Sequence, residues 1–296
     1  MGYHSIVLVK QVPDTANISG QVMKEDGTVN RALLPAIFNH EDRVALEIAL
    51  QIQDNFGGTV SAITMGPPRA SDVLRECLFM GADNAYLISD RKFAGADTLA
   101  TSYVLSEAIK KIGNYDFIFA GRQAIDGDTA QVGPQTAEKL GIPQITYAQE
   151  IISLKENHAV IKKKIEGGYE ILETALPCLI TVLKDAVFPR PYKAKRVMTY
   201  KNAKTLIELE KLTEGNSLLY IDQLKYEYIS KHIYINTLTM DDLKLDSERC
   251  GVAGSPTKVH KIESVVLKGN KHENIEPTKQ GIGDLIDKLM EDHIFG

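Results

Sequence analysis

The stretch that decides the fold is Ala120–Gly141, AGRQAIDGDTAQVGPQTAEKLG. It follows an apolar run, Phe117–Ala120, which is typical of a buried strand. Gly121, Gly127 and Gly133 mark a loop, and the amphipathic residues up to Gly141 predict a short helix. A strand, a glycine-bearing turn and a helix start together present free backbone N–H groups to a phosphate. We therefore expect this loop to hold the phosphates of an adenine nucleotide.

The same loop has a second interpretation, in which its glycines serve only the turn between a strand and a helix. The slim residues Thr129–Gly133 favour outward-pointing amides, whereas Asp126 and Asp128 would repel a phosphate unless their carboxylates turn away. A carboxylate also caps helices or binds ribose hydroxyls, and Arg122 offsets part of the charge. The chain has no GxGxxG or Walker A sequence, and GSPTK at Gly254–Lys258 lacks the length of the latter. On spacing alone, both interpretations stay open.

Composition excludes two classes of partner. The 296 residues are 44% hydrophobic and 25% charged, which is ordinary for globular proteins. The net charge of −5 argues against general nucleic-acid binding, which needs a dominant basic face. No apolar run approaches the roughly 20 residues of a membrane span, so we expect no membrane insertion. The N-terminus runs straight into strand-like residues, so we expect no signal peptide, and Cys77, Cys178 and Cys250 form no CxxC pattern. We therefore expect a cytoplasmic, reducing compartment without a structural metal site.

Strand-like and helical segments alternate from the N-terminus to the glycine loop. Short apolar runs predict strands at Ser5–Lys10, Thr59–Met65, Ala85–Ser89 and Tyr115–Ala120. Amphipathic stretches predict helices at Arg43–Gln53, Ala70–Met80 and Leu99–Ile112, with Asn39 or Asp42 as the first N-cap. This alternation is typical of βαβ units. We therefore predict an α/β fold with a doubly wound, mostly parallel, Rossmann-like sheet and a C-terminal extension.

Three turns of the predicted sheet fall on one edge, beyond the carboxyl ends of the strands. They are Met65–Pro67, Ala94–Thr98 and Gly121–Gly133. Ligands of parallel sheets bind beyond that edge, so the three turns predict one pocket. His40 lies near its rim, although a lone histidine is more often structural than catalytic. Because no nucleophile–base pair stands out, we expect a bound cofactor to carry any chemistry.

The sequence pattern changes after Pro143. The segments Ile145–Leu154 and Ala159–Ile165 predict a hairpin, and Tyr169–Leu183 adds further strand-like sequence. The remainder from Thr205 is polar and weakly patterned, apart from an apolar patch at Leu218–Ile221 and a final helix at Ile282–Ile294. We expect a nucleotide-binding domain over residues 1–183, followed by an extension over residues 184–296.

A basic stretch, Arg190–Lys204, opens this extension and has two interpretations. The commoner one is a solvated loop. The other is a docking arm, because apolar side chains stand among the charges, and apolar anchors ringed by steering charges are how transient partners associate. These apolar residues are Val187, Phe188, Tyr192, Val197 and Met198.

Five stretches, in order along nearly the whole chain, match a known family. They are Ile6–Thr15 (IVLVKQVPDT), Met65–Pro67, Met80–Asp83, Gly121–Pro134 and Gly254–Val259 (GSPTKV). Together they resemble the β subunit of electron-transferring flavoproteins. The resemblance implies a heterodimer with a larger α subunit, a role in passing electrons between dehydrogenases, and a C-terminal arm that reaches onto the α subunit.

The resemblance also implies which residues bind an adenine nucleotide, and these include the three turns placed by the strand ends. The matching positions are Leu8, Asn39, His40, Glu41, Asp42, Met65, Gly66, Asp97, Thr98, Thr101, Gly121, Arg122, Gln123, Ala124, Ile125, Asp126, Gly127, Asp128, Thr129, Ala130, Gln131 and Val132.

Two branches of the family differ in the nucleotide that the β subunit holds. Conventional members hold AMP as a structural ligand, whereas electron-bifurcating members hold FAD, which accepts a hydride from NADH. The segment Asp126–Pro134 resembles the bifurcating branch, and Ala96–Thr101 resembles that branch's segment beside the flavin ring and nicotinamide. Gly127, where conventional members carry an acid, removes a charge where a second phosphate would sit. Thr98 and Thr101 would donate hydrogen bonds to a flavin edge.

Three hypotheses follow. In the first, the chain is a bifurcating β subunit. One electron from its FAD would then reach a low-potential acceptor such as ferredoxin or flavodoxin, and the other an acyl-CoA-type dehydrogenase through the FAD of the α subunit. In the second, it is a conventional β subunit with AMP. In the third, it is a stand-alone nucleotide-binding or ATP-using protein of similar fold.

Two features depart from the family's pattern. The basic stretch matches the recognition loop for partner dehydrogenases, but Ala194 stands roughly where an anchoring leucine is expected. Phe188, Val197 or Met198 would then replace it. The aromatic-rich segment Asn216–Asn236 looks like an addition, which we expect to pack on the α subunit or on a partner.

Overall fold

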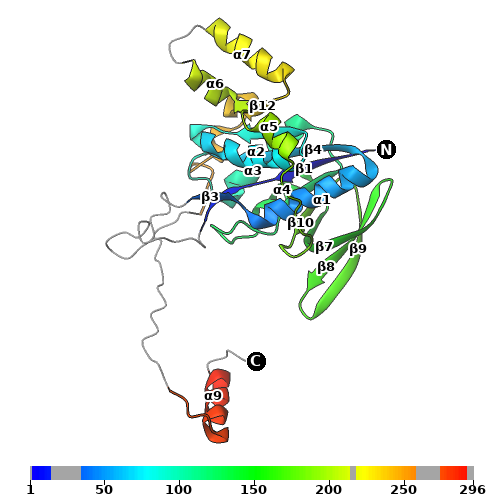
Figure 1. Ribbon diagram of the computed structural model, residues 1–296, viewed down its shortest axis with the longest axis vertical. Coiled ribbons are helices and arrows are strands. Elements are labelled where there is room, and N and C mark those ends of the chain that lie inside the picture. Colours follow the sequence, from blue (N-terminus) through cyan, green and yellow to red (C-terminus); the bar gives the residue numbers. More distant parts are fainter. Residues whose placement is uncertain (1, 15–34, 214–217, 258–273, 292–296) are drawn as a thin grey trace, which may run out of the picture. The chain divides into compact units, whose positions relative to one another are not determined.

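A large sheet forms the centre of the computed structural model, which describes residues 2–14, 35–213, 218–257 and 274–291 (Figure 1). Its strands are β1 (Tyr3–Leu8), β4 (Gly58–Met65), β5 (Asn84–Ile88), β6 (Phe117–Gly121), β7 (Gln144–Lys155), β8 (His158–Ile165), β9 (Gly168–Ala175), β10 (Cys178–Val182), β11 (Lys204–Thr205) and β12 (Tyr234–Leu238). Over the described residues, their order in the sheet is β11-β12-β5-β4-β1-β6-β10-β7-β8-β9. Neighbours from β11 to β7 are parallel, and the β7–β8 and β8–β9 pairs are antiparallel. The predicted mostly parallel α/β fold is confirmed.

Helices cover both faces of the sheet (Figure 1). On one face lie α1 (His40–Phe56) and α2 (Ser71–Met80), with α5 (Ala194–Tyr200) against α2. On the other lie α3 (Thr98–Ile112), α4 (Val132–Leu140) and α8 (Met240–Leu243). The remaining elements are β2 (Gln11–Pro13), β3 (Ala36–Phe38), α6 (Leu206–Leu212), α7 (Leu218–Ser230), α9 (Lys279–Glu291) and the short 3₁₀ helices η3 (Pro68–Ala70), η4 (Arg91–Phe93) and η5 (Ser247–Arg249). No helix among the described residues combines the length and apolarity needed to cross a bilayer.

The central strands are largely apolar because both of their faces are covered. In β1, Ile6 packs in the cluster under α3, whereas Val7 packs in the cluster under α1. In β6, Phe117 and Phe119 stack on each other on the α1 side, and Ile118 points to the α3 side. Side chains alternate between the faces of a strand, so burial on both faces leaves a continuous apolar run.

The chain reverses its direction of travel across the sheet next to β1. From β1 it moves outward to β4 and β5, and it then returns to place β6 on the other side of β1. Such a reversal leaves a crevice beyond the carboxyl ends of the two strands, where ligands of doubly wound sheets bind. The glycine loop follows β6 at this position, as the sequence indicated.

Helix α1 begins three residues earlier than the sequence suggested. It starts at His40 rather than Arg43, with Asn39 at the N-cap position but without a side-chain capping bond. Glu41 and Asp42 are buried within the first turn. Their carboxylates bind the backbone of the glycine loop, which is far away in the sequence, so Asp42 does not cap the helix, and Asn39, the other predicted candidate, takes the N-cap position.

Residues after the predicted boundary at position 183 extend the same sheet. Strand β12 pairs in parallel with β5, so it belongs to the central sheet. The predicted hairpin, which lies before position 183, is confirmed as β7–β8. The chain divides into two compact units, Met1–His260 and Lys261–Gly296, so position 183 falls inside the larger unit. Strand β12 was not anticipated from the sequence, because it has only five residues and two of them, Asn236 and Thr237, are polar.

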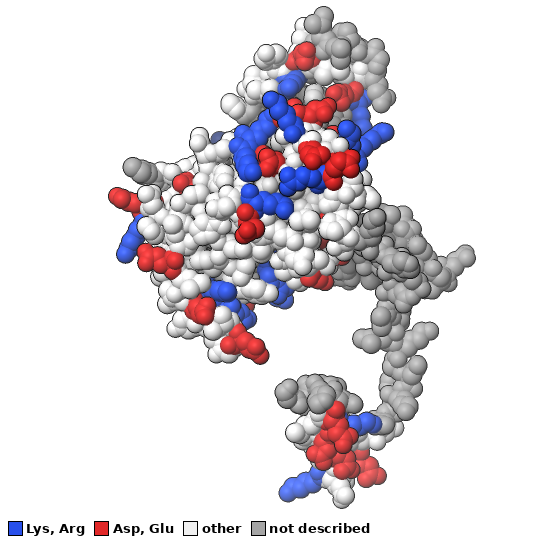
Figure 2. Space-filling view, turned by 180° about the vertical axis from the view of Figure 1, so that it is seen from behind, with Lys and Arg blue, Asp and Glu red and all other residues white. Residues whose placement is uncertain are grey.

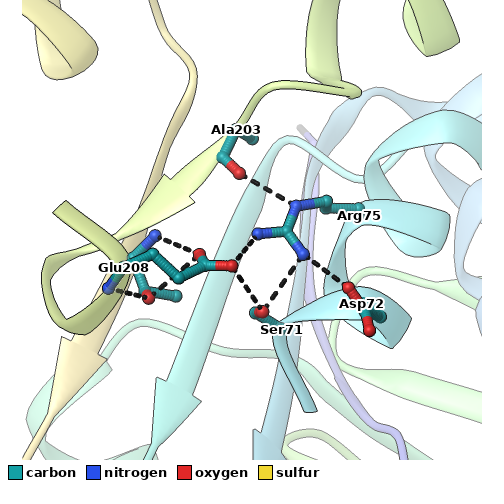
Figure 3. A network of polar contacts seen from close by, with 6 residues as sticks. Ser71, Asp72, Arg75, Ala203 and Glu208 are labelled. Atoms are coloured by element: carbon teal, nitrogen blue, oxygen red, sulfur yellow. Dashed lines mark hydrogen bonds and ion pairs between the residues drawn. The ribbon is translucent and has the colours of Figure 1, made fainter. Parts of the chain in front are cut away.

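A polar network fastens the residues before α6 to α2 (Figure 3). Arg75 of α2 donates through Nε to the carbonyl of Ala203 at 2.9 Å and forms an ion pair with Glu208. The other oxygen of Glu208 accepts from the backbone N–H of Thr205 at 2.8 Å, which closes a capping box at the start of α6. Ser71 and Asp72 of α2 complete the network. Backbone pairing and this network therefore hold residues 203–208 on the sheet.

The basic stretch is fastened to the same face. Arg190 binds Glu47 of α1 at 2.8 Å and Asp54 at 2.8 Å, and Arg196 donates to the carbonyls of Leu78 and Ala82 at the end of α2. These two arginines therefore hold the basic stretch on α1 and α2, a role that neither interpretation of the stretch anticipated. Phe188 and Met198 stay exposed, at 97% and 65% of their surface.

The predicted final helix at Ile282–Ile294 corresponds to α9, which spans Lys279–Glu291. Residues 292–294 of that prediction lie outside the described residues. So do residues 216–217 of the aromatic-rich segment.

Candidate functional site

Asp42 joins the ends of β1 and β6, the two strands at which the chain reverses its direction across the sheet. One carboxylate oxygen accepts from the backbone N–H of Lys10 at 2.9 Å, just after β1, and the other from the N–H of Gly121 at 3.0 Å, at the end of β6. Burial raises the pKa of Asp42 to about 7, although the hydrogen bonds from Asn39, Gly121 and Lys10 act in the opposite direction. A Cβ on Gly121 would lie 2.5 Å from the Asp42 carboxylate, so only glycine allows this close approach.

Asn39 and Glu41 hold the first residues of the glycine loop. Glu41 accepts from the backbone N–H of Gln123 at 2.8 Å and pairs with the Arg122 guanidinium at 3.1 Å. Asn39 donates to the carbonyl of Gln123 at 2.9 Å and accepts from the N–H of Ile125 at 3.4 Å. Together with Asp42, these residues occupy the amides of positions 121, 123 and 125. The start of α1 therefore fixes the first half of the loop.

Both loop acids have partners on the protein. The Asp126 carboxylate lies 2.8 Å from the Lys10 ammonium, and Asp128 accepts from the side-chain amide of Gln123 at 2.8 Å. The repulsion expected between these acids and a phosphate is therefore reduced. Lys10 was absent from the predicted site residues, although its place at the end of the first predicted strand was a usable signal.

The second half of the loop has a strained backbone and free amides. Asp128 and Ala130 adopt left-handed conformations with φ of 50° and 52°, which cost non-glycine residues roughly 1–2 kcal/mol each. Such strain clusters where a backbone is shaped for a ligand. Within the described chain, the amides of Thr129 and Ala130 have no acceptor, and the first N–H groups of α4 need a partner from outside the helix. This half of the loop fits a phosphate group.

Glycine at position 133 lets α4 sit close to the sheet. A Cβ there would lie 2.8 Å from the Thr181 side chain on β10. Gly127 differs, because it is exposed and an added Cβ would meet no described atom within 4 Å. Of these two glycines, Gly133 is required for packing, whereas Gly127 leaves open space beside the loop.

The start of α3 borders the same loop. Asp97 caps α3 by accepting from the N–H groups of Leu99 and Ala100 at 2.9 and 3.0 Å. Thr98 donates its hydroxyl to the side-chain oxygen of Gln131, at the N-cap of α4, at 2.9 Å. Thr101 is one turn further along α3 and is partly exposed. Desolvation alone would raise the pKa of Asp97, but its backbone donors outweigh it and leave the pKa below the usual value.

The remaining predicted residues lie around this centre without joining its hydrogen bonds. Leu8 is buried in the core, so its part in the site is limited to its backbone position at the end of β1. Met65 and Gly66 lie at the end of β4, and His40 is exposed on the first turn of α1. The structure thus unites the loop with Asn39, Glu41, Asp42 and Thr98, and leaves Leu8, Met65, Gly66 and His40 at the border.

Comparisons with known proteins place this site in a family. Residues 26–205 match the family described as "Electron transfer flavoprotein domain". The chain is 40% identical to "Electron transfer flavoprotein subunit beta" of Clostridium acetobutylicum over 97% of this chain and 98% of the relative. It is 42% identical to "Acryloyl-CoA reductase electron transfer subunit gamma" of Anaerotignum propionicum over 98% of both chains. It is also 40% identical to "Caffeyl-CoA reductase-Etf complex subunit CarD" of Acetobacterium woodii, over 98% of this chain and 99% of the relative.

The family match covers more than half of the chain and contains the whole glycine loop. The relatives match almost from end to end at 40% identity or more. The chain therefore belongs to the electron transfer flavoprotein family.

Proposed function

We propose that this chain is the β subunit of an electron-bifurcating electron transfer flavoprotein. In the cytoplasm it would pair with an α subunit and hold FAD in the loop Gly121–Val132. When bound, the flavin would supply the redox chemistry, by which a hydride from NADH yields one electron for ferredoxin or flavodoxin and one for an acyl-CoA-type dehydrogenase through the α-subunit FAD.

One observation carries the proposal: the second half of the loop combines left-handed residues with unpaired amides. Asp128 and Ala130 hold the strained conformations, and the free N–H groups continue into the first turn of α4. Backbone amides at a helix start attract a phosphate both by hydrogen bonding and through the helix dipole. The first half of the loop binds α1 instead, and the N–H of Asp128 donates to the Ala124 carbonyl, so we assign the phosphates to Thr129–Gly133.

Two features favour FAD over AMP. Gly127 leaves open space beside this run of amides, which suits the second phosphate of a dinucleotide. Asp126 and Asp128 are paired with Lys10 and Gln123, so neither presents an unpaired charge to that phosphate. The side chains that shape the loop thus accept two phosphates as readily as one.

The hydroxyls of α3 would orient the flavin ring. Thr98 is already committed to Gln131, whereas the hydroxyl of Thr101 has no partner within the described chain. Thr101 is therefore the better donor to a ring edge, and it would favour the electron-rich reduced form.

Names of two relatives support the partner class. One name is that of a subunit of an acryloyl-CoA reductase, and the other that of a subunit of a caffeyl-CoA reductase complex. Both names describe reductases of acyl-CoA compounds. We propose that the basic stretch docks such a partner through Phe188 and Met198, the two most exposed of its apolar side chains. Arg190 and Arg196 hold this surface in place on α1 and α2.

Helix α9 supports the proposed arm onto the α subunit. Its apolar residues Ile282, Ile286 and Met290 are about half exposed and recur at helical spacing. Asp284, Asp287 and Glu291 recur at helical spacing along α9, and Figure 2 shows acidic side chains gathered on this helix. A helix with one apolar and one acidic side suits a groove on a partner subunit.

Counting nucleotides in the purified α–β complex tests the proposal. Two FAD per heterodimer, one of them bleached by NADH, would support bifurcation. One FAD and one AMP, without NADH bleaching, would overturn it and favour the conventional β subunit, which is the second candidate. The control is the complex carrying Thr101→Val, for which we expect the same FAD count and a lower potential for the NADH-reducible flavin.

A further inference from the structure

Asp97 uses its two carboxylate oxygens for different tasks. Oδ1 accepts from the N–H groups of Leu99 and Ala100 and so caps α3. Oδ2 accepts from the backbone N–H of Thr257 at 3.1 Å, and the N–H of Asp97 itself donates to the Ser255 hydroxyl at 2.8 Å. The first turn of α3 is therefore held both by its own cap and by a segment about 160 positions away.

That segment is packed tightly against the turn before α3. A Cβ on Gly251 would lie 2.2 Å from the carbonyl oxygen of Lys92, and a Cβ on Gly95 would lie 2.6 Å from the Val252 side chain. Both glycines have left-handed backbones, with φ of 52° and 72°. The backbones of residues 250–257 and of the turn before α3 lie too close together to shift toward each other. Residues 250–257 therefore hold Asp97 in a fixed position.

The contact continues from Asp97 to the glycine loop. Thr98, the next residue, donates its hydroxyl to the side-chain oxygen of Gln131 at the N-cap of α4. The backbone N–H of Gln135, in α4, donates to the backbone carbonyl of Gln131 at 2.9 Å. Gln131 therefore receives one bond from α3 and one from α4. The start of α3 is thus linked through Thr98 to the residue at the N-cap of α4.

We propose that Asp97 is a positioning residue for the nucleotide site. Held by Ser255 and Thr257, it sets Thr98 against Gln131 and thereby orients the free amides at the start of α4 toward the nucleotide phosphates. This inference rests on the proposed function in assigning phosphates to that helix start, but it applies to FAD and AMP alike. The family resemblance implied nucleotide contact for Asp97, and in this proposal it acts through Thr98 and Gln131 instead.

The decisive variant is Asp97→Asn. Asparagine caps helices about as well as aspartate, so its oxygen keeps the bonds to Leu99 and Ala100. Its amide group then faces the N–H of Thr257, and two donors cannot bond to each other. Only the bond from the Thr257 N–H is lost, while the bond from the Asp97 N–H to Ser255 stays. We expect the bound nucleotide to leave the purified α–β complex about three- to tenfold faster, as is usual for residues that couple two sites.

Asp90 offers a matched control on the same turn. Its Oδ1 accepts from the N–H of Lys92 at 3.0 Å and caps η4, while its Oδ2 accepts from the N–H of Met240 at 3.2 Å. It thus has the same chemistry, a short-helix cap plus a tie to a C-terminal backbone, but no contact with Thr98 or Gln131. Asp90→Asn should lower the Tm about as much as Asp97→Asn and leave the nucleotide release rate unchanged.

A double-mutant cycle tests the route through Thr98. Thr98→Val removes the hydroxyl that binds Gln131 and should speed nucleotide release as Asp97→Asn does, whereas Thr98→Ser should restore the original rate. If Asp97 acts through Thr98, the double variant Asp97→Asn/Thr98→Val should release nucleotide no faster than Thr98→Val alone. Ser255→Ala, which removes the acceptor for the Asp97 N–H, should reproduce part of the effect without touching α3.

The release rate is measured by diluting the complex rapidly, separating free nucleotide by ultrafiltration at set times, and reading the absorbance of the nucleotide that copurified. Unchanged release from Asp97→Asn, equal acceleration by Asp90→Asn, or additive effects in the double variant would each overturn the inference. The identity of the released nucleotide decides the proposed function separately. AMP in place of FAD would remove the bifurcating assignment and leave the role of Asp97 intact.

Discussion

Replacing Gly127 by aspartate adds a negative charge to the loop without crowding it. Gly127 is exposed, and an added Cβ would meet no described atom within 4 Å, so the folded chain accommodates the side chain. The change introduces the acid that, by the family resemblance, conventional members carry at this position. It places that acid beside the run of free amides assigned to the phosphates.

The size of the effect follows from electrostatics. For a carboxylate about 7 Å from a doubly charged diphosphate, an effective dielectric constant of about 40 gives a repulsion of about 2 kcal/mol. This corresponds to roughly a thirtyfold rise in the Kd of FAD. Because the position is exposed, salt screens the interaction, and at about 1 M ionic strength, where the Debye length is near 3 Å, most of the rise should disappear.

Fluorescence titration of FAD into the nucleotide-free α–β complex measures the change at low and high salt. Gly127→Asn is the matched control, since it has the same shape without the charge, and its Kd should stay within about threefold of the original. Equal weakening by aspartate and asparagine would show a steric cause. An unchanged Kd with aspartate would contradict the placement of the diphosphate beside Gly127.

Three further predictions concern stability. Gly121→Ala should lower the free energy of unfolding in urea by about 2–4 kcal/mol, since its Cβ would lie 2.5 Å from a carboxylate oxygen of Asp42, whereas Gly127→Ala should change it by less than about 0.5 kcal/mol. Burial raises the pKa of Asp42 to about 7 in the folded state, so the stability from this group is present below about pH 4 and is lost as the pH rises to about 7. Asp42→Asn should therefore flatten the pH dependence of urea unfolding in this window, and identical slopes in both proteins would refute that origin. Glu208→Gln should cost about 2 kcal/mol because this acid both caps α6 and pairs with an arginine of α2, whereas Glu107→Gln, which breaks an exposed pair on α3, should cost under about 0.5 kcal/mol by the same measurement.

The parallel core of the fold was predictable because burial on both faces of a strand leaves an uninterrupted apolar run in the sequence. A strand such as β6, with Phe117–Ala120 covered on each side, has no polar position to interrupt its apolar run. The glycine loop was predictable for a related reason, since its glycines and slim residues follow that run directly. Strand ends then placed Thr98 near the loop, and the bond between Thr98 and Gln131 agrees with this placement.

Partners far apart in the sequence were not predictable. Asp42 has the same local pattern whether it caps its own helix, faces solvent or binds the N–H of Gly121. The ion pair of Arg190 with Glu47 spans 143 positions, so a charge that holds the chain together could not be told from one that steers a partner. The strain at Ala130 is also invisible in the sequence, because alanine carries no mark of a left-handed backbone.

The bonds from α1 to the glycine loop also have a consequence for the order of folding. Asn39, Glu41 and Asp42 bind loop residues that lie 79 to 86 positions away. Contacts with such long separations form late, because the entropy of closing the intervening chain must be overcome first. The loop should thus gain its shape only after β6 has docked beside β1. A nascent chain released before that strand would have no nucleotide site, and nucleotide binding would report that the centre of the sheet is complete.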